Sequence, residues 1–299
     1  MTTASPRYGG SVQRRPEGVW PVDVDFVDLY EKTTAVGKAA AKHGDAVIIG
    51  IARNAMPYLA NTLECVKEAV PQFRDCKMFI YENDSTDGTA EYLDEFAANN
   101  DWLTVQHDTL GGEDARGFQP ERTVRLAKCR NICLEWVRAN APTAHWVIVL
   151  DLDPHGGFSP DGIFNSIGWL AKKATQPCVR RPAGMASFSL WAEEQDGGKS
   201  PPRIAGYDSW AARMNWWRDR RDEIGFAWFS MLLFPVGAPP VPMNSAFGGL
   251  CVYMAEAFLA PGVAYEGSDC EHVPLHRSMQ AAGYQLYINP GSRYIAHWQ

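Results

Sequence analysis

Short apolar segments rich in valine and isoleucine alternate along this chain with longer segments of helical periodicity. The segments typical of buried strands are AVIIGI at 46–51, KMFIY at 77–81, WLTVQ at 102–106 and HWVIVL at 145–150. Helical patterns separate them: one begins at Pro57, one contains Tyr92 and Phe96, and one covers 121–138. Strands that alternate with helices indicate a mostly parallel sheet with helices on both faces. The alternation therefore predicts an α/β fold.

The other expected elements extend this pattern without an internal repeat or a flexible linker. They are helices at 25–42, after Asp161 and at 271–281, a strand at 184–189, an apolar segment at 247–254, and short strands at 284–288 and 293–297. The segment after Lys199 is irregular. Residues 1–24 lack an apolar signal-peptide core and read as a mobile tail. We therefore expect a single large domain over 25–299.

Charge and cysteine content limit the classes of protein to which this chain can belong. The formal net charge of −7 argues against a broad basic surface for nucleic acid, although a local basic groove remains compatible with it. The seven cysteines are odd in number and form no C-x-x-C motif, which favours a reducing compartment. Residues 224–255 carry no charge, but four prolines interrupt them, so we expect no stable membrane insertion.

Two carboxylates follow the clearest strand signal of the sequence. Asp151 and Asp153 are two residues apart, so both side chains point to one side if the backbone stays extended. Like-charged oxygen ligands at the carboxyl edge of a parallel sheet are typical of a Mg²⁺ or Mn²⁺ site that also binds phosphates. The alternative is a solvated turn closed by Pro154 and two glycines. After a buried strand, the metal site is the favoured interpretation.

Further polar residues lie at the ends of the other expected strands and in the long helix. An acid at a strand end can bind a nucleoside, and an arginine there can bind a phosphate, although turn formation, helix capping and structural ion pairing explain the same residues. The candidates for nucleotide binding are Ala52, Arg53, Asn54, Glu82, Asp84 and Arg130. Gly248 and Gly249 would let the backbone approach a sugar closely, or would form a strand bend.

Several motifs together resemble glycosyltransferases of the GT-A fold. They are ARN and ENDSTDGT after the first two strands, CRN in the long helix, DLDPHGG, SDCEHVPLHRSM and INPGSRYIAHW. More narrowly, the chain resembles the fungal capsule-associated α-1,3-mannosyltransferase family over 46–298. The resemblance implies a single GT-A domain with a nucleotide-binding half at 45–153 and an acceptor-binding half at 154–299.

The resemblance also implies roles for individual residues. Asp153 would ligate the metal directly, and Asp151 would contact the metal or the ribose or sugar of the donor. Glu82 and Arg53 would lie near the nucleoside. Either Glu271 or Asp269 would face the acceptor hydroxyl, and Glu271 is preferred, although both acids also suit a helix start.

His297 is the candidate for a third metal ligand, because enzymes of this fold often recruit a histidine near the C-terminus. A lone surface histidine is the alternative.

The implied activity is metal-dependent transfer of mannose from GDP-mannose, with retention of configuration and with Mn²⁺ or Mg²⁺ as cofactor. A UDP-sugar is the other donor considered, and the acceptor is a glycan, glycolipid, glycoprotein or modified nucleic acid. The chain lacks the membrane anchor of the fungal members, which favours a cytoplasmic enzyme. Two other classes share the pattern: a sugar-phosphate nucleotidyltransferase, which should carry a glycine-rich phosphate loop where this chain has GIARNAMPY, and an inactive carbohydrate-binding protein.

Overall fold

The structure is a computed structural model that describes residues 15–111, 119–176, 180–196, 200–214 and 233–298. Its helices are α1 (Pro16–Val19), α2 (Val27–Ala41), α3 (Leu59–Ala69), α4 (Thr89–Ala98), α5 (Pro120–Asn140), α6 (Pro160–Ala174), α8 (Ala255–Phe258) and α9 (His272–Ala281), with short 3₁₀ turns η1 (Val24–Phe26) and η2 (Val70–Gln72). Its strands are β1 (Asp45–Ala52), β2 (Asp75–Asn83), β3 (Leu103–Asp108), β4 (Trp146–Asp151), β5 (Arg181–Gln195), β6 (Ser200–Tyr207), β7 (Val241–Met243), β8 (Leu250–Met254) and β9 (Tyr284–Trp298).

One mixed sheet forms the centre of the molecule, in the order β3-β2-β1-β4-β8-β5-β9-β7, with β6 paired to β5. The first four strands are parallel, and Ile48 at the middle of β1 pairs in register with Met78 of β2 and Ile148 of β4. All three side chains are buried, because helices cover both faces of this part of the sheet. The uninterrupted apolar runs of the sequence are the direct consequence.

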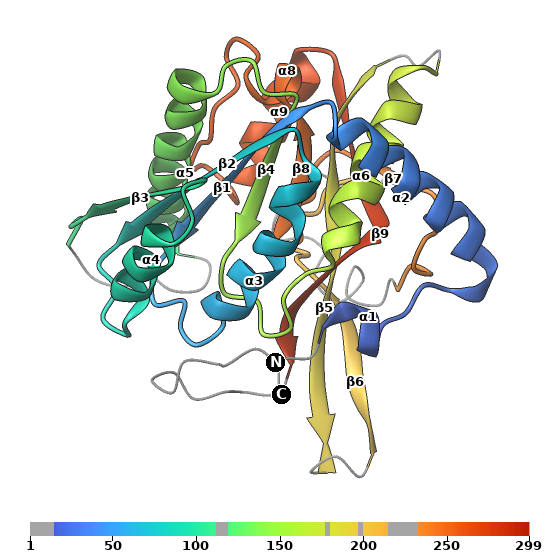
Figure 1. Cartoon of the computed structure of the whole chain (residues 1–299), viewed down its shortest axis with the longest axis horizontal. Coiled ribbons are helices and arrows are strands. Elements are labelled where there is room, and N and C mark those ends of the chain that lie inside the picture. The colour runs from blue at the N-terminus through green and yellow to red at the C-terminus, as the bar shows by residue number, and fades with distance from the viewer. Residues whose placement is uncertain (1–14, 112–118, 177–179, 197–199, 215–232, 299) are drawn as a thin grey trace.

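Helices cover the two faces of the sheet in separate layers (Figure 1). One core contains Leu63 of α3, Leu93 of α4 and Ile163 of α6. The core on the other face contains Leu134 of α5 and Val273 of α9. The expected α/β architecture, a mostly parallel sheet flanked by helices, is confirmed.

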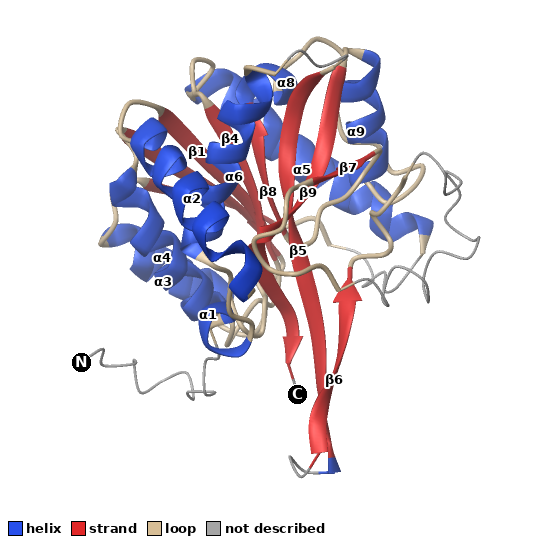
Figure 2. Cartoon of the chain, turned by 90° about the vertical axis from the view of Figure 1, so that its right-hand side faces the viewer, coloured by secondary structure: helices blue, strands red, loops and turns tan. Residues whose placement is uncertain are grey.

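The carboxyl end of β4 is fixed by backbone pairing with the last strand. Residues 155–159 run along β9: the amide of Gly156 donates to the carbonyl of Ile295 at 3.1 Å, and that of Ser159 to Arg293 at 2.9 Å. The loop that follows the two aspartates is therefore part of the sheet edge. Beyond it, β5 and β6 continue as a two-stranded ribbon that projects from the body of the molecule (Figure 2).

The structure differs from the sequence predictions in three places. The strands expected at 284–288 and 293–297 form one strand, β9, because the three residues after Asn289 make a bulge against β5. Strands β6 and β7 were not expected. The described part of the expected tail contains α1, and Trp20 packs against Phe188 at 5.3 Å between ring centroids. Residues 1–14 and 215–223, the second half of the irregular segment at 206–223, lie outside the described residues.

The described cysteines are buried and form no disulfide with one another. Cys178 lies outside the described residues. In the part of the chain that the structure covers, we find no helix with the length and apolar character needed to span a bilayer.

Candidate active site

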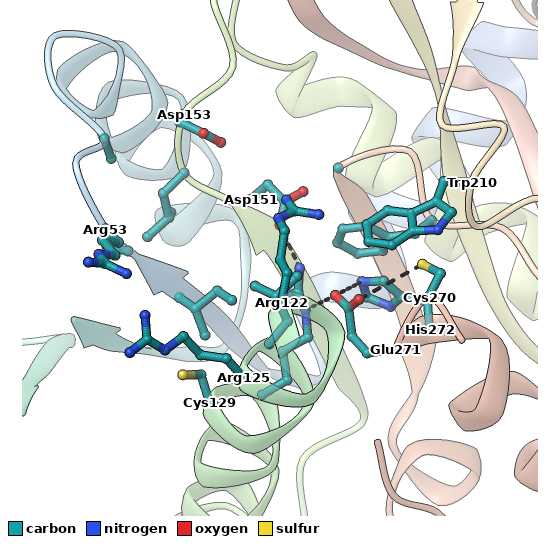
Figure 3. Close-up of a pocket in the computed structure, with 18 of the residues that line it drawn as sticks. Arg53, Arg122, Arg125, Cys129, Asp151, Asp153, Trp210, Cys270, Glu271 and His272 are labelled. Carbon is teal, nitrogen blue, oxygen red and sulfur yellow. Dashed lines mark hydrogen bonds and ion pairs between the residues drawn. The ribbon is translucent and has the colours of Figure 1, made fainter. Parts of the chain in front are cut away.

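A cavity of about 360 Å³ opens at the carboxyl edge of the parallel strands (Figure 3). The ends of β1, β2 and β4 line one part of it, and α5, the segment after β6 and the start of α9 line the rest. Eight of the predicted site residues line this cavity: Ala52, Arg53, Asn54, Arg130, Asp151, Asp153, Gly249 and Glu271. The edge of the sheet that the sequence indicated is therefore the place where a ligand can bind.

A buried arginine connects the end of β4 to the start of α9. Arg130 donates from Nη2 to Asp151 at 2.8 Å and from Nε to Glu271 at 2.9 Å. Although burial alone would lower the pKa of Arg130, the charges of Asp151 and Glu271 hold it well above its usual value. Arg130 thus forms structural ion pairs and also lines the pocket, so a structural role and a role in ligand binding are compatible. Glu271, only 2% exposed, has this guanidinium as its cationic partner.

Asp153 differs from Asp151 in its surroundings. Its side chain is exposed within the pocket, and no arginine or lysine forms an ion pair with it among the described contacts. Desolvation by the walls of the pocket is the larger cause that raises the pKa of Asp153, and the negative charge of Asp151 is the second. Two neighbouring carboxylates, of which one lacks a cationic partner, fit a divalent cation, because the cation relieves their repulsion.

The protein ligands for such a cation come from this pair alone. Among the described residues, no three acidic, histidine or cysteine side chains are grouped closely enough to hold a metal. His297 lies in an aromatic stack between Trp191, at 3.9 Å between ring centroids, and His155, at 4.5 Å. Its predicted role as third ligand is therefore not part of the geometry seen here. One or two carboxylates with substrate phosphates are sufficient for Mg²⁺ or Mn²⁺.

Three further arginines give the pocket a basic side (Figure 3). Arg53 follows β1, whereas Arg122 and Arg125 project from the first turns of α5, and all three line the cavity. Arg122 also lies over the ring of Trp210, 5.1 Å from its centroid, and Arg125 donates to the carbonyl of Gly111. Guanidinium groups opposite an acidic pair can bind the oxygens of a diphosphate.

Asp208 is a pocket residue that sequence reasoning missed. It follows β6 with a left-handed backbone (φ 73°), and its carboxylate accepts from the amides of Gly248 at 2.8 Å and Ala211 at 3.3 Å. Burial and the nearby charges of Asp151 and Glu271 raise its pKa to about 7, although the amide contacts act in the opposite direction. A carboxyl group with this pKa can accept or release a proton at neutral pH.

Two predicted nucleoside ligands lie outside the cavity, and this corrects the prediction for both. Glu82 is buried, accepts from the amide of Ser85 at 3.0 Å and pairs with His107 at 2.7 Å. Asp84 accepts from the amides of Leu110 at 3.1 Å and Gly111 at 3.3 Å. Both carboxylates are thus used to form the turn after β2 and to hold the loop after β3.

Asp269 and Gly248 also lie outside the cavity. Both oxygens of Asp269 accept from the buried Arg213 at 3.1 Å, so Asp269 fixes the segment after β6 while Glu271 faces the cavity. Gly248 has a φ of 66°, and its carbonyl accepts from Ser187 at 2.5 Å. A side chain at Gly248 would overlap the backbone of Ser187. Its close approach is therefore to β5, which agrees with the strand-bend alternative, whereas Gly249 lines the cavity.

The residues that sequence reasoning missed are Arg122, Arg125, Tyr207, Asp208 and Phe247. Periodicity showed that α5 carries arginines but not which of them face the strand ends. The isolated Asp208 lies in a segment without a clear pattern, so its sequence offered no signal.

Residues 47–202, more than half of the chain, match the family model described as Glycosyl transferase family 2. The chain belongs to glycosyltransferase family 2. The acidic pair, the arginines of α5 and all of β5 lie within the matched segment, which ends inside β6. No curated protein matches this family 2 member.

Three solved structures are similar to this family 2 member. The crystal structure of GalNAc-T7 with UDP, GalNAc and Mn²⁺ is 17% identical, covers 86% of this chain and 44% of its own, and superposes with a TM-score of 0.50. The mannosyltransferase PcManGT from Pyrobaculum calidifontis, in complex with GDP-Man and Mn²⁺, is 12% identical, with 91% and 66% covered and a TM-score of 0.48. TarS 1–349 from S. aureus is 11% identical, with 85% and 60% covered and a TM-score of 0.46.

These similarities concern the fold. The family 2 chain spans between 44% and 66% of the lengths of these three proteins.

Proposed function

We propose that this family 2 protein transfers a sugar from a nucleoside diphosphate sugar to an acceptor hydroxyl, in a reaction that depends on a divalent cation. One observation carries the proposal: an acidic pair at the end of β4 and a group of arginines line the same cavity at the edge of a GT-A sheet. The chemistry of a diphosphate leaving group requires both features.

The leaving group determines what the arginines do. When the bond between sugar and diphosphate breaks, negative charge increases on the departing phosphate. Arg53, Arg122 and Arg125 are placed to stabilise that charge, since preorganised cationic groups gain strength in a partly dry pocket. Asp151 and Asp153 are the residues that would hold Mg²⁺ or Mn²⁺, which neutralises the diphosphate when bound. Arg130 orients Asp151 through the 2.8 Å contact.

The acceptor side of the reaction falls to the second half of the chain. Glu271, Asp208 and Trp210 line the part of the cavity formed after β6 and before α9. This supports the division into a donor half at 45–153 and an acceptor half at 154–299. Glu271, ion-paired with Arg130, would hold and orient the acceptor hydroxyl. Asp208 is the group whose pKa suits proton transfer at neutral pH.

For the donor we propose GDP-mannose, with retention of configuration. The support is the resemblance of DLDPHGG, SDCEHVPLHRSM and INPGSRYIAHW to the fungal capsule-associated α-1,3-mannosyltransferases. A UDP-sugar is the second candidate, and proton NMR of the anomeric centre of the product distinguishes retention from inversion. The acceptor classes considered from the sequence, and cytoplasmic residence, remain part of this proposal.

A donor panel tests the proposed function. The protein is incubated with GDP-mannose, UDP-glucose, UDP-galactose and UDP-N-acetylglucosamine in Mn²⁺, with and without EDTA, and release of nucleoside diphosphate is followed. We expect release from one donor and its loss in EDTA. Calorimetry with the same ligands measures binding separately. Absence of binding to every nucleotide sugar in excess Mn²⁺ or Mg²⁺ would contradict the proposal, and pyrophosphate exchange would favour a nucleotidyltransferase.

Asp153→Asn is the sharpest variant for this test. We expect nucleotide release to fall by at least about 100-fold, because one neutral ligand weakens the cation site and the charge that it supplies. The thermal midpoint of the metal-free variant should stay within a few degrees of the wild type, since the substitution removes a like-charge repulsion. Asp161→Asn, at a half-exposed ion pair with Lys38, is the matched control. Full activity of Asp153→Asn would exclude this residue from the site.

A further inference from the structure

A row of aromatic rings borders the cavity and continues onto the projecting ribbon. Trp191 of β5 pairs in register with His297 of β9, and their rings stack at 3.9 Å between centroids with 15° between planes. The ring of Trp191 also lies 5.8 Å from that of Tyr207 on β6. Three adjacent strands therefore present aromatic side chains next to one another.

The row also extends in the direction of the acidic loop. The ring of His297 lies 4.5 Å from His155, which in turn stacks on Tyr58 at 4.0 Å. His155 follows Asp153 by two residues, and its position is fixed by the backbone pairing of residues 155–159 with β9. We call Tyr58, His155, His297, Trp191 and Tyr207 the aromatic row.

The ribbon end of the aromatic row is open to solvent. Trp191 is 36% exposed and Tyr207 is 40% exposed. The indole N–H of Trp191 donates to Glu193 at 3.0 Å, which satisfies its only polar group and fixes the orientation of the ring. A rigid and accessible aromatic pair of this kind binds ligands at low entropic cost.

The position of this pair relative to the cavity indicates which ligand it meets. Tyr207 lines the cavity directly and precedes Asp208, at the part of the cavity that lies on the acceptor side. The nucleoside end of the cavity is formed by residues 52–54, at the ends of β1 and β2. A ligand on Trp191 and Tyr207 is therefore continuous with the acceptor side of the cavity.

The local charge favours a carbohydrate over a lipid surface. Glu193 lies beside Trp191 and Asp208 follows Tyr207, whereas the cavity arginines Arg53, Arg122 and Arg125 come from the end of β1 and from α5. A surface for anionic lipid needs a cluster of lysine or arginine next to the exposed rings. Pyranose rings have one face of C–H groups that packs on aromatic rings and polar hydroxyls that suit neighbouring carboxylates. We propose that Trp191 and Tyr207 bind a pyranose unit of the acceptor, next to the unit whose hydroxyl reacts.

This proposal rests on the proposed function and assigns its acceptor class: a carbohydrate of at least two units. The row positions the acceptor and takes no part in bond breaking. His297, which the sequence suggested as a metal ligand, here stacks against the ring of Trp191 and fixes its position.

A glycan array tests the proposal. Wild-type protein with Mn²⁺ and a nucleoside diphosphate is applied to immobilised mono- and oligosaccharides that end in mannose, glucose, galactose or N-acetylglucosamine. We expect binding to at least one oligosaccharide and about tenfold weaker binding to the corresponding monosaccharide. Trp191→Ala should weaken oligosaccharide binding about tenfold, and Trp191→Phe, which keeps a ring, should weaken it less.

Ile204→Ala is the matched control. Ile204 is also 40% exposed on the ribbon, but it pairs with Ala192 and so lies on the opposite face from Trp191. We expect this variant to bind glycans as the wild type does. Calorimetry of donor binding to the wild type and to each variant separates the two proposals. If the wild type binds no donor, the proposed function is wrong. If Trp191→Ala binds glycans as the wild type does, the proposed role of the aromatic row is wrong.

Three further outcomes would overturn the inference. One is the absence of binding to any oligosaccharide by protein that binds its donor. Another is an equal loss of oligosaccharide binding in Trp191→Ala and Ile204→Ala. The last is binding to phosphatidylcholine–phosphatidylserine vesicles that depends on Trp191 while glycan binding does not, which would assign the row to a lipid surface. If Trp191→Ala fails to fold, the comparison of Trp191→Phe with Ile204→Ala carries the test.

Discussion

Arg130 is the residue on which the geometry of the cavity depends. It is buried and forms ion pairs with Asp151 of β4 and with Glu271 before α9. One guanidinium therefore fixes two carboxylates that the proposed function assigns to the donor side and to the acceptor side of the cavity.

Loss of Arg130 should cost stability as well as activity. We expect Arg130→Leu to lower the free energy of unfolding by about 3 kcal/mol or more, because it leaves the buried Glu271 without its cationic partner. Urea denaturation measures this. Lys32→Leu, which removes an exposed pair with Asp28, is the control and should change stability by less than about 1 kcal/mol. If the two substitutions lowered the free energy of unfolding equally, the buried ion pair would contribute no more to stability than the exposed one.

Asp208 makes a prediction about pH. Its pKa is about 7 in the folded protein and near 3.8 when unfolded, so the folded state holds a proton that the unfolded state has lost between these values. Stability from Asp208 is therefore full at low pH, decreases as pH rises through this range, and is level above about 7. Asp208→Asn lacks the effect. Thermal midpoints at several pH values should show the wild type losing stability relative to this variant from pH 4 to 7. A difference independent of pH would contradict the raised pKa.

At the scale of single residues, sequence reasoning located the acidic pair because a buried strand runs directly into it. It misplaced Glu82 and Asp84, because an acid that binds a nucleoside and an acid that forms a turn have the same local sequence. Only the contacts with His107 and with the amides after β3 distinguish the two roles.

At the scale of elements, α2 and α6 pack unusually closely because each contributes a glycine to the contact. A side chain at Gly168 would overlap the carbonyl of Thr33, and one at Gly37 would overlap the carbonyl of Phe164. The two backbones thus touch at reciprocal positions, and the pair covers one face of the sheet beside β5 (Figure 1).

Gly168→Ala should force these helices apart. We expect it to lower the free energy of unfolding by about 2 kcal/mol, because the overlap with backbone outweighs the roughly 1 kcal/mol that alanine gains in helix propensity. Gly18→Ala in α1, where no atom lies within 4 Å of the added carbon, is the control and should be neutral or slightly stabilising. Chemical denaturation compares them, and a stabilised Gly168→Ala would refute the close contact.

The elements that the sequence predicted well are those with both a clear period and a clear boundary. Three of the four parallel strands, β1, β2 and β4, have apolar runs in the sequence because both of their faces are covered, whereas the edge strand β3 is mostly exposed. Strand β6 was missed because two consecutive prolines at 201–202 argue against a strand, although they are tolerated on the edge of the projecting ribbon. Pro290 similarly concealed the continuity of β9 across its bulge.

At the scale of the whole molecule, the cysteines report on how cooperatively the chain is packed. The six described cysteines are distributed over both cores and the pocket wall, and all are buried. Burial raises the pKa of Cys65 to about 11 and that of Cys76 and Cys133 to about 12.

These thiols should react only when the molecule unfolds. In native buffer at pH 8 we expect the six to be labelled by a thiol reagent at the rate of global opening, since the buried thiols supply almost no thiolate. In guanidinium chloride, labelling should be complete within the dead time. Peptide mapping by mass spectrometry assigns each site. Rapid native labelling of any of the six would indicate a part of the fold that opens independently.

The position of β9 has a consequence for biosynthesis. This strand lies between β5 and β7, and its backbone also anchors the loop after Asp153. A nascent polypeptide cannot complete the sheet until residue 298 has left the ribosomal exit tunnel. The loop after Asp153 is therefore unanchored until β9 has emerged and paired with it, so we expect the proposed cation site to form only after residues 293–298 have left the ribosome.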